Sequence, residues 1–119
     1  MKPGDTFLIP DAIATHLNCV LAVLEDGSLL MCHFTTRRKR SDATCVIKKG
    51  EHSACTNDET VVRFDQVHIC PAGAGVEALK RLITKTYEPL SAELLARVRK
   101  GALDSPQTPD KYKTLLKKI

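Results

Sequence analysis

Six cations and two hydroxyl side chains lie within one short stretch of the sequence and could bind phosphate. Residues 37–49 carry six cations against one acid, Asp42. The cations are Arg37, Arg38, Lys39, Arg40, Lys48 and Lys49. Thr35 and Thr36 come directly before them, and hydroxyl and guanidinium groups at one strand end favour a phosphate site. A solvated loop is the plain alternative.

Histidine and cysteine offer two further kinds of chemistry, which the spacing does not favour. The four His and five Cys include no Cys-x-x-Cys pair, so no zinc pattern is present and we expect neither a metal ion nor a cofactor. Cys32 and His33 are adjacent, so on a strand they point to opposite faces and cannot form a nucleophile–base pair. The cysteines are expected as small buried hydrophobes in a reducing compartment.

Five segments have the composition of β-strands. They are residues 5–9, 17–24, 29–36, 43–48 and 59–70. Asp26-Gly27 lies between two of them and predicts a hairpin turn. A loop is expected over residues 11–15. In the last segment, alternation predicts one face with Val62 and Phe64 and another with Arg63 and Val67.

Helices are expected in the second half of the chain. Apolar residues at helical spacing predict one over residues 74–85. Ser91 is placed as the N-cap of a second helix, for which Gly101 is a natural stop. Thr108 followed by Pro109 predicts the start of a third.

The order of strands before helices indicates an α+β domain. The 119 residues fit one domain, with a β part over 1–70 and a helical part over 73–119. Short strands with tight turns predict a small barrel or a strongly bent sheet. No apolar run is long enough to cross a membrane, and no leader segment is recognisable, so we expect a cytoplasmic protein. The net charge of +4 permits a polyanionic partner without requiring one.

Three segments together resemble the MazF/PemK toxin family. Residues 2–9 (KPGDTFLI) are similar to the Gly-Asp start of that family. Residues 32–36 (CHFTT) resemble its hydrophobic-Pro-Ile-Thr-Ser segment. Residues 60–68 (TVVRFDQVH) resemble its Ser-Val-Val-x-x-Asp-Gln-Ile-Arg strand. The three occur in the family's order and cover residues 2 to 70.

This resemblance implies a fold, an activity and partners. The implied fold is a small SH3-like β-barrel of about five strands followed by C-terminal helices. The implied activity is a metal-independent endoribonuclease that cleaves single-stranded RNA by attack of the ribose 2′-hydroxyl on the adjacent phosphorus. The implied partners are RNA, a small antitoxin protein and a second copy of the chain in a homodimer.

Residue by residue, Thr35 matches the catalytic threonine of the family. Its catalytic Arg-Pro is absent before the second strand, where His16 and Asn18 stand instead. We therefore expect Thr35 and Arg37 to stabilise the phosphate and His16 to transfer a proton. The expected RNA-binding residues are Thr36, Arg38, Lys39, Arg40, Lys48 and Lys49. The missing Arg-Pro leaves an alternative, a catalytically inactive SH3-like barrel that binds protein or RNA.

Overall fold

The computed structural model describes residues 1–10 and 15–119, which form a seven-stranded antiparallel sheet and three α-helices. The strands are β1 (Thr6–Pro10), β2 (Thr15–Val23), β3 (Leu29–Thr36), β4 (Val46–Lys48), β5 (Glu59–Val62), β6 (His68–Cys70) and β7 (Lys85–Tyr87). The helices are α1 (Ala74–Leu82), α2 (Ala92–Asp104) and α3 (Asp110–Lys117), with a short 3-10 helix, η1 (Phe64–Gln66). The α+β class expected from the sequence is confirmed.

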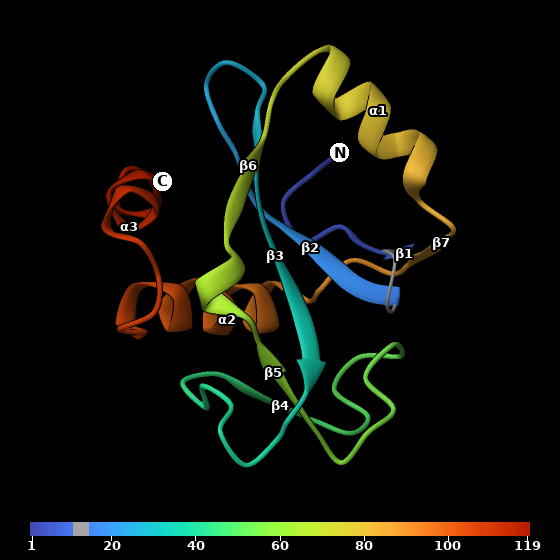
Figure 1. The fold of residues 1–119 in the computed structure, drawn as a ribbon, viewed down its shortest axis with the longest axis vertical. Helices are drawn as coiled ribbons and strands as arrows, with labels where there is room; N and C mark the ends of the chain where they lie inside the picture. Colours follow the sequence, from blue (N-terminus) through green and yellow to red (C-terminus); the bar gives the residue numbers. More distant parts are fainter. Residues whose placement is uncertain (11–14) are drawn as a thin grey trace.

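The strands are hydrogen-bonded in the order β4-β5-β3-β2-β1-β7, and β6 pairs with the other end of β3. The long strands β2 and β3 lie at the centre, and β4 and β5 extend below them in Figure 1. The order ends at β4 on one side and at β7 on the other, so the described strands form an open sheet. There are seven strands instead of the expected five, partly because the three-residue strand β7 carries no sequence signal.

The helices cover the sheet from separate sides. Leu94 and Val98 of α2 and Leu116 of α3 join the larger core, while Leu79 of α1 joins a smaller one with Phe7. In Figure 1, α2 and α3 lie at the left and α1 at the upper right. Alternation along β3 sends Leu30, Cys32 and Phe34 into the larger core and Met31 into the smaller one. His33 and Thr35 lie on the same face of β3 as Met31, toward the C-terminal end of the strand.

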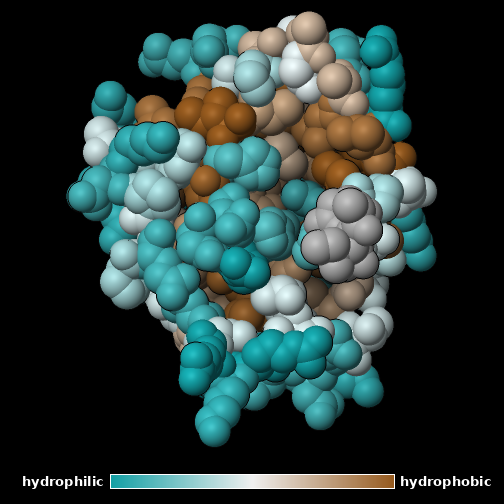
Figure 2. Space-filling view, in the orientation of Figure 1, coloured by the Kyte–Doolittle hydropathy of each residue, from teal (hydrophilic) through white to brown (hydrophobic). Residues whose placement is uncertain are grey.

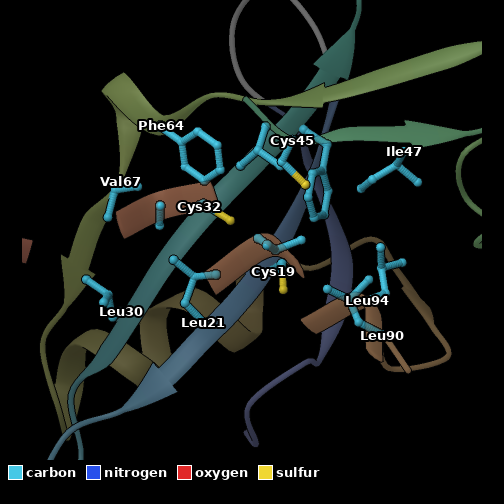
Figure 3. Close-up of a cluster of buried hydrophobic side chains, with 14 of the residues drawn as sticks. Cys19, Leu21, Leu30, Cys32, Cys45, Ile47, Phe64, Val67, Leu90 and Leu94 are labelled. Carbon is cyan, nitrogen blue, oxygen red and sulfur yellow. The ribbon is translucent and has the colours of Figure 1, made fainter. Parts of the chain in front are cut away.

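The larger core is rich in sulfur. Cys19 on β2 is the cross-strand partner of Cys32 on β3, and both are fully buried. Figure 3 shows them with Cys45 among Leu21, Phe64 and other apolar side chains. All five cysteines are free thiols. Contact with Cys19 and burial raise the pKa of the Cys32 thiol well above its usual value, and burial also raises the pKa of Cys45. The Cys32 and Cys45 thiols are therefore protonated packing groups rather than nucleophiles.

The predicted strand over residues 59–70 is wrong as one continuous element. Phe64 and Val67 both belong to the larger core, and residues three apart on an extended strand would point to opposite faces. The chain solves this by turning through η1 between β5 and β6. On the outside of the turn, Arg63 and Asp65 form a bidentate ion pair. Nε of Arg63 donates to Oδ1 of Asp65 at 2.9 Å and Nη2 donates to Oδ2 at 2.8 Å.

Three helix boundaries also differ from the prediction. Helix α1 ends at Leu82 instead of Lys85, which belongs to β7. Helix α2 continues past Gly101 to Asp104, because this glycine packs against Phe64 and Cys45 instead of ending the helix. Pro109 occupies the N-cap position of α3 without a side-chain cap hydrogen bond, and Thr108 is buried with its hydroxyl outside the hydrogen bonds of the described residues.

Other local predictions are confirmed. The Ser91 hydroxyl accepts the Leu94 N–H at 3.1 Å and caps α2. The β2–β3 hairpin turns at Asp26-Gly27, where Gly27 has a φ of +86° that a glycine adopts without strain.

Of the predicted loop over 11–15, residues 11–14 lie outside the described residues and Thr15 begins β2. Of the other four predicted strands, the one over 29–36 keeps its bounds, and those over 5–9, 17–24 and 43–48 are observed at Thr6–Pro10, Thr15–Val23 and Val46–Lys48. None of the described helices combines the length and the apolar character that a membrane crossing requires.

Candidate nucleic-acid site on the sheet

A polar strip crosses one face of the sheet at the end that α1 leaves uncovered. On β2, His16 and Asn18 alternate with the core residues Leu17 and Cys19, and on β3 His33 alternates with Cys32 and Phe34. Asn18 is the cross-strand partner of His33, so these side chains share a face. Figure 2 shows mostly hydrophilic residues over the middle and lower parts of the molecule and hydrophobic residues above them.

An open pocket of about 260 Å³ lies where β2 begins and β3 ends. Leu17 pairs with Phe34, so the next residues outward, His16 and Thr35, lie on neighbouring strands at the same end of the sheet. Both line the pocket, as does Thr36. The remaining lining residues are Leu8, Thr15, Leu17, Phe34, Ala54, Cys55, Asn57 and Thr60. Three of the site residues expected from the sequence are thus brought to one pocket.

The Thr36 hydroxyl accepts a hydrogen bond from Nδ2 of Asn57 at 2.8 Å. This bond ties the end of β3 to the loop over residues 49–58, which forms the lower wall of the pocket. Thr35 is half-buried. A hydroxyl at such a position can donate a hydrogen bond to a ligand oxygen in the pocket.

Arg37 lies immediately beyond the pocket and is held by an acid. Its backbone N–H donates to the Glu59 carbonyl at 3.0 Å, which extends the β3–β5 pairing by one residue. Its Nη1 lies 3.1 Å from Oε2 of Glu59, and Nζ of Lys48 lies 2.8 Å from the same oxygen. Lys48 and Arg37 hold the pKa of the Glu59 carboxyl below its usual range. The Glu59 carboxylate therefore forms ion pairs with two of the expected phosphate-binding cations, Arg37 and Lys48.

The other four expected RNA-binding cations lie in exposed turns. Arg38, Lys39 and Arg40 follow β3, and Ser41 stabilises their turn by accepting the Arg38 N–H at 2.7 Å. Lys49 follows β4. Among the described residues, these four do not line the pocket. The two loops that hold them extend below the sheet in Figure 1, where long side chains remain free to reach a polyanion.

His33 and Arg63 are part of this face and were not expected as site residues. The His33 ring lies 4.8 Å from the His16 ring between centroids, with the planes tilted by 41°. The backbone N–H of Arg63 donates to the His33 carbonyl at 2.9 Å. Strand alternation places His33 on the face of Thr35, which is a signal the sequence contains. The position of Arg63, thirty residues away, depends on the β3–β5 pairing, which the sequence does not give.

His33 is held in its neutral form in the free protein. Burial, followed by the positive fields of His16, Arg63 and His68, lowers the pKa of His33 to about 4, and Asp65 opposes them. A neutral imidazole has one nitrogen that can accept a proton and one that can donate. An anion that arrives beside His33 would raise the pKa of His33 and favour its protonated form.

Within the described part of the chain, no group of three or more His, Cys, Asp or Glu side chains is arranged to hold a metal ion. His52 is buried and serves a structural role: its Nδ1 accepts the Ala54 N–H at 3.1 Å and its Nε2 donates to the Glu88 carbonyl at 2.8 Å. It joins the 49–58 loop to the chain after β7.

Comparison with protein-family models and with curated proteins finds no match to this chain. Membership of the MazF/PemK family stays a prediction that depends on the three sequence segments. The geometry of the pocket and the polar strip is the remaining basis for a function.

Proposed function

We propose that this protein is a metal-independent endoribonuclease of the MazF/PemK type that cleaves single-stranded RNA by transesterification. The observation that carries the proposal is that His16 and Thr35 line one pocket at the end of two neighbouring strands. Both were expected at the site from the family resemblance, and their shared pocket supports their acting on one substrate.

The proposed reaction needs no cofactor. The ribose 2′-oxygen loses its proton and forms a bond to phosphorus, and the bond from phosphorus to the 5′-oxygen breaks as that oxygen gains a proton. The products are a 2′,3′-cyclic phosphate and a 5′-hydroxyl. His16 performs one of the two proton transfers, and the Thr35 hydroxyl donates a hydrogen bond to a phosphoryl oxygen.

Arg37 supplies positive charge to the same phosphate after exchanging its partner. In the free protein it is bound to Glu59, an exposed ion pair of low cost to separate. A phosphate that enters the pocket competes with Glu59 for the Arg37 guanidinium, to which it can bind in a bidentate manner. Lys48, which shares Glu59, binds the next part of the backbone in this proposal, along with Thr36, Arg38, Lys39, Arg40 and Lys49.

The rest of the proposal follows the family resemblance. The sheet is proposed as a divergent SH3-like barrel, and the chain as a homodimer in the cytoplasm whose activity a small antitoxin protein inhibits. An acidic antitoxin would compete with RNA for the same cations.

The proposal is tested by incubating the purified protein with a long RNA in the presence of EDTA. Thr35→Ala should lower the cleavage rate by about 100-fold or more, the usual cost of losing a donor to a phosphoryl or oxyanion oxygen, while Thr35→Ser should retain most of it. Thr56→Ala is the matched control, because Thr56 is an exposed threonine of the 49–58 loop. Unchanged cleavage by Thr35→Ala would refute the assignment.

The second candidate is a catalytically inactive module that binds RNA or protein. The pairing of Arg37 with Glu59 favours it, because the chain lacks the Arg-Pro of the family and the substitute cation is already neutralised. Intact RNA in the cleavage assay, with binding that weakens steeply as salt rises, would select an RNA-binding module. Binding insensitive to salt would point to a protein partner.

A further inference from the structure

Three histidines and an arginine from four separate segments gather beside the Thr35 pocket. His16 lies on β2 and His33 on β3, with ring centroids 4.8 Å apart. Arg63 joins β5 to η1 and is bonded through its backbone to His33. His68 on β6 is exposed and pairs with Met31, two residues from His33 on the same face of β3.

Basic side chains outnumber acidic ones around His33. The groups that face it are His16 from β2, Arg63 before η1, His68 from β6 and one acid, Asp65 of η1. Asp65 is occupied by Arg63 through two hydrogen bonds of 2.9 and 2.8 Å. Burial is the largest cause of the low pKa of His33, and the neighbouring basic side chains add to it, so an anion placed beside the ring would raise this pKa again.

We propose that the His16–His33 pair, with Arg63 and His68 at its edge, binds one backbone phosphate of a nucleic acid next to the Thr35 pocket and takes up a proton onto His33 when it does so. The identity of the ligand rests on the proposed function. The negative charge of the phosphate offsets the positive field of the neighbouring basic groups and favours protonation of His33. Once protonated, both ring nitrogens of His33 carry a hydrogen, and one of them donates a hydrogen bond to the phosphate. The bound phosphate then has contacts from β2, β3 and the η1 segment at once.

A nucleic-acid backbone fits this face better than an acidic protein surface. Arg37 and Lys48 continue the row of basic side chains from His33 past Thr35, since Thr35 pairs with Val61 and Lys48 with Glu59 along the same strands. Such a row suits the evenly spaced phosphates of one strand. Protein interfaces instead centre on apolar and aromatic side chains, and the middle of this surface is mostly hydrophilic (Figure 2).

The experiment uses a ten-nucleotide single-stranded DNA, which has the same charged phosphate backbone as RNA but has no 2′-hydroxyl and cannot be cleaved by transesterification. The His33 imidazole is titrated by NMR with and without this DNA. We expect its pKa to rise from about 4 by about one unit or more, which corresponds to a tenfold or greater coupling. An unchanged His33 titration in the DNA-bound protein, or failure of the protein to bind the DNA, would overturn the proposal.

A second readout is the pH dependence of the DNA dissociation constant. One proton taken up on binding makes log Kd rise by about one unit per pH unit between the free and the bound pKa. His33→Gln should reduce this dependence between the free and the bound pKa of His33, and His68→Gln, at an exposed position, should weaken binding by about threefold. Lys117→Gln, an exposed charge on α3, is the control. Equal pH dependence in His33→Gln and the control would contradict the proposal.

Two further arms separate the causes of failure. If the wild-type protein takes up a proton on binding DNA but leaves RNA intact, the phosphate site stands and the proposed nuclease falls. If it cleaves RNA while His33 does not change its titration, the nuclease stands and the phosphate site falls. Binding of polyglutamate as tight as that of DNA, with the same proton uptake, would assign the site to an acidic protein and overturn the proposal.

Discussion

The Arg37 guanidinium lies 3.1 Å from the Glu59 carboxylate, on the next strand of the sheet. Lys48, on the strand beyond, binds the same carboxylate oxygen at 2.8 Å. Glu59 thus bridges three neighbouring parts of the sheet and forms ion pairs with two exposed cations. Any polyanion that uses these cations has to compete with it.

Glu59→Gln should therefore increase RNA affinity by several-fold, since it releases both cations. If each gains one phosphate contact, the log–log dependence of affinity on salt should steepen by roughly 0.7 per contact. Filter binding over a salt series measures both effects. Asp58→Asn is the matched control because it removes an equal charge one residue away, and equal effects of the two variants would show that net charge alone is responsible.

Arg99 should stabilise an irregularity in the central pair of strands. The β2–β3 register shifts between Val20 and Ala22, and Nε of Arg99 donates to the Leu21 carbonyl at this bulge at 2.8 Å. Arg99→Ala should cost about 1–3 kcal/mol, because it leaves a buried carbonyl without its donor. Urea denaturation measures the loss, and Arg81→Ala on the exposed side of α1 should change stability little. A loss no larger than that of Arg81→Ala would contradict this account.

Gly101→Ala should destabilise the protein although alanine favours helices. A Cβ at this position would lie 2.8 Å from Cζ of Phe64 and 2.9 Å from Cβ of Cys45. Overpacking of this kind costs about 1–3 kcal/mol, which exceeds the gain of about 1 kcal/mol in helix propensity. Thermal unfolding measures the sum. A rise in melting temperature would mean that α2 does not pack this closely on η1.

The stability of the protein should fall as the pH drops from about 6.5 to 4, in part through His33. The folded pKa of His33 is about 4 and its unfolded value about 6.5, so in this window the unfolded chain binds a proton that the folded chain does not. The contribution of neutral His33 to the free energy of unfolding is complete above the unfolded pKa. It is lost as the pH falls from the unfolded pKa through the folded one.

His33→Gln should therefore reduce the slope of the unfolding free energy against pH within that window. Urea denaturation at a series of pH values measures the slope. His68→Gln serves as the comparison, because His68 is exposed on the same face. A slope that is the same in the wild-type protein and in His33→Gln would contradict the role of burial at His33.

Local signals in the sequence predicted those parts of the fold that depend on local interactions. The Asp26-Gly27 turn and the Ser91 cap are set by residues within four positions of each other. The break at η1 could not be predicted, because it arises from Phe64 and Val67 both entering the core under α2. Gly101 was misjudged for the same reason: its role is a contact with Phe64, far away in the sequence.

The candidate site was predictable in part. Thr35, Thr36 and His16 were expected individually, and the pairing of β2 with β3 brings them to one pocket. The neutralisation of Arg37 by Glu59 depends on the pairing of β3 with β5, which sequence alone does not specify. Arg63 approaches His33 through the same pairing.

The most direct test of the central claim replaces one ribose. An RNA is first cleaved by the protein in EDTA to locate a cut, and a second RNA is made with a single 2′-deoxynucleotide immediately 5′ of it. The account predicts that cleavage at that bond disappears, while other cuts remain and end in cyclic phosphate. Continued cleavage at the deoxy position would show that water and not the 2′-hydroxyl attacks, and would contradict transesterification at the Thr35 pocket.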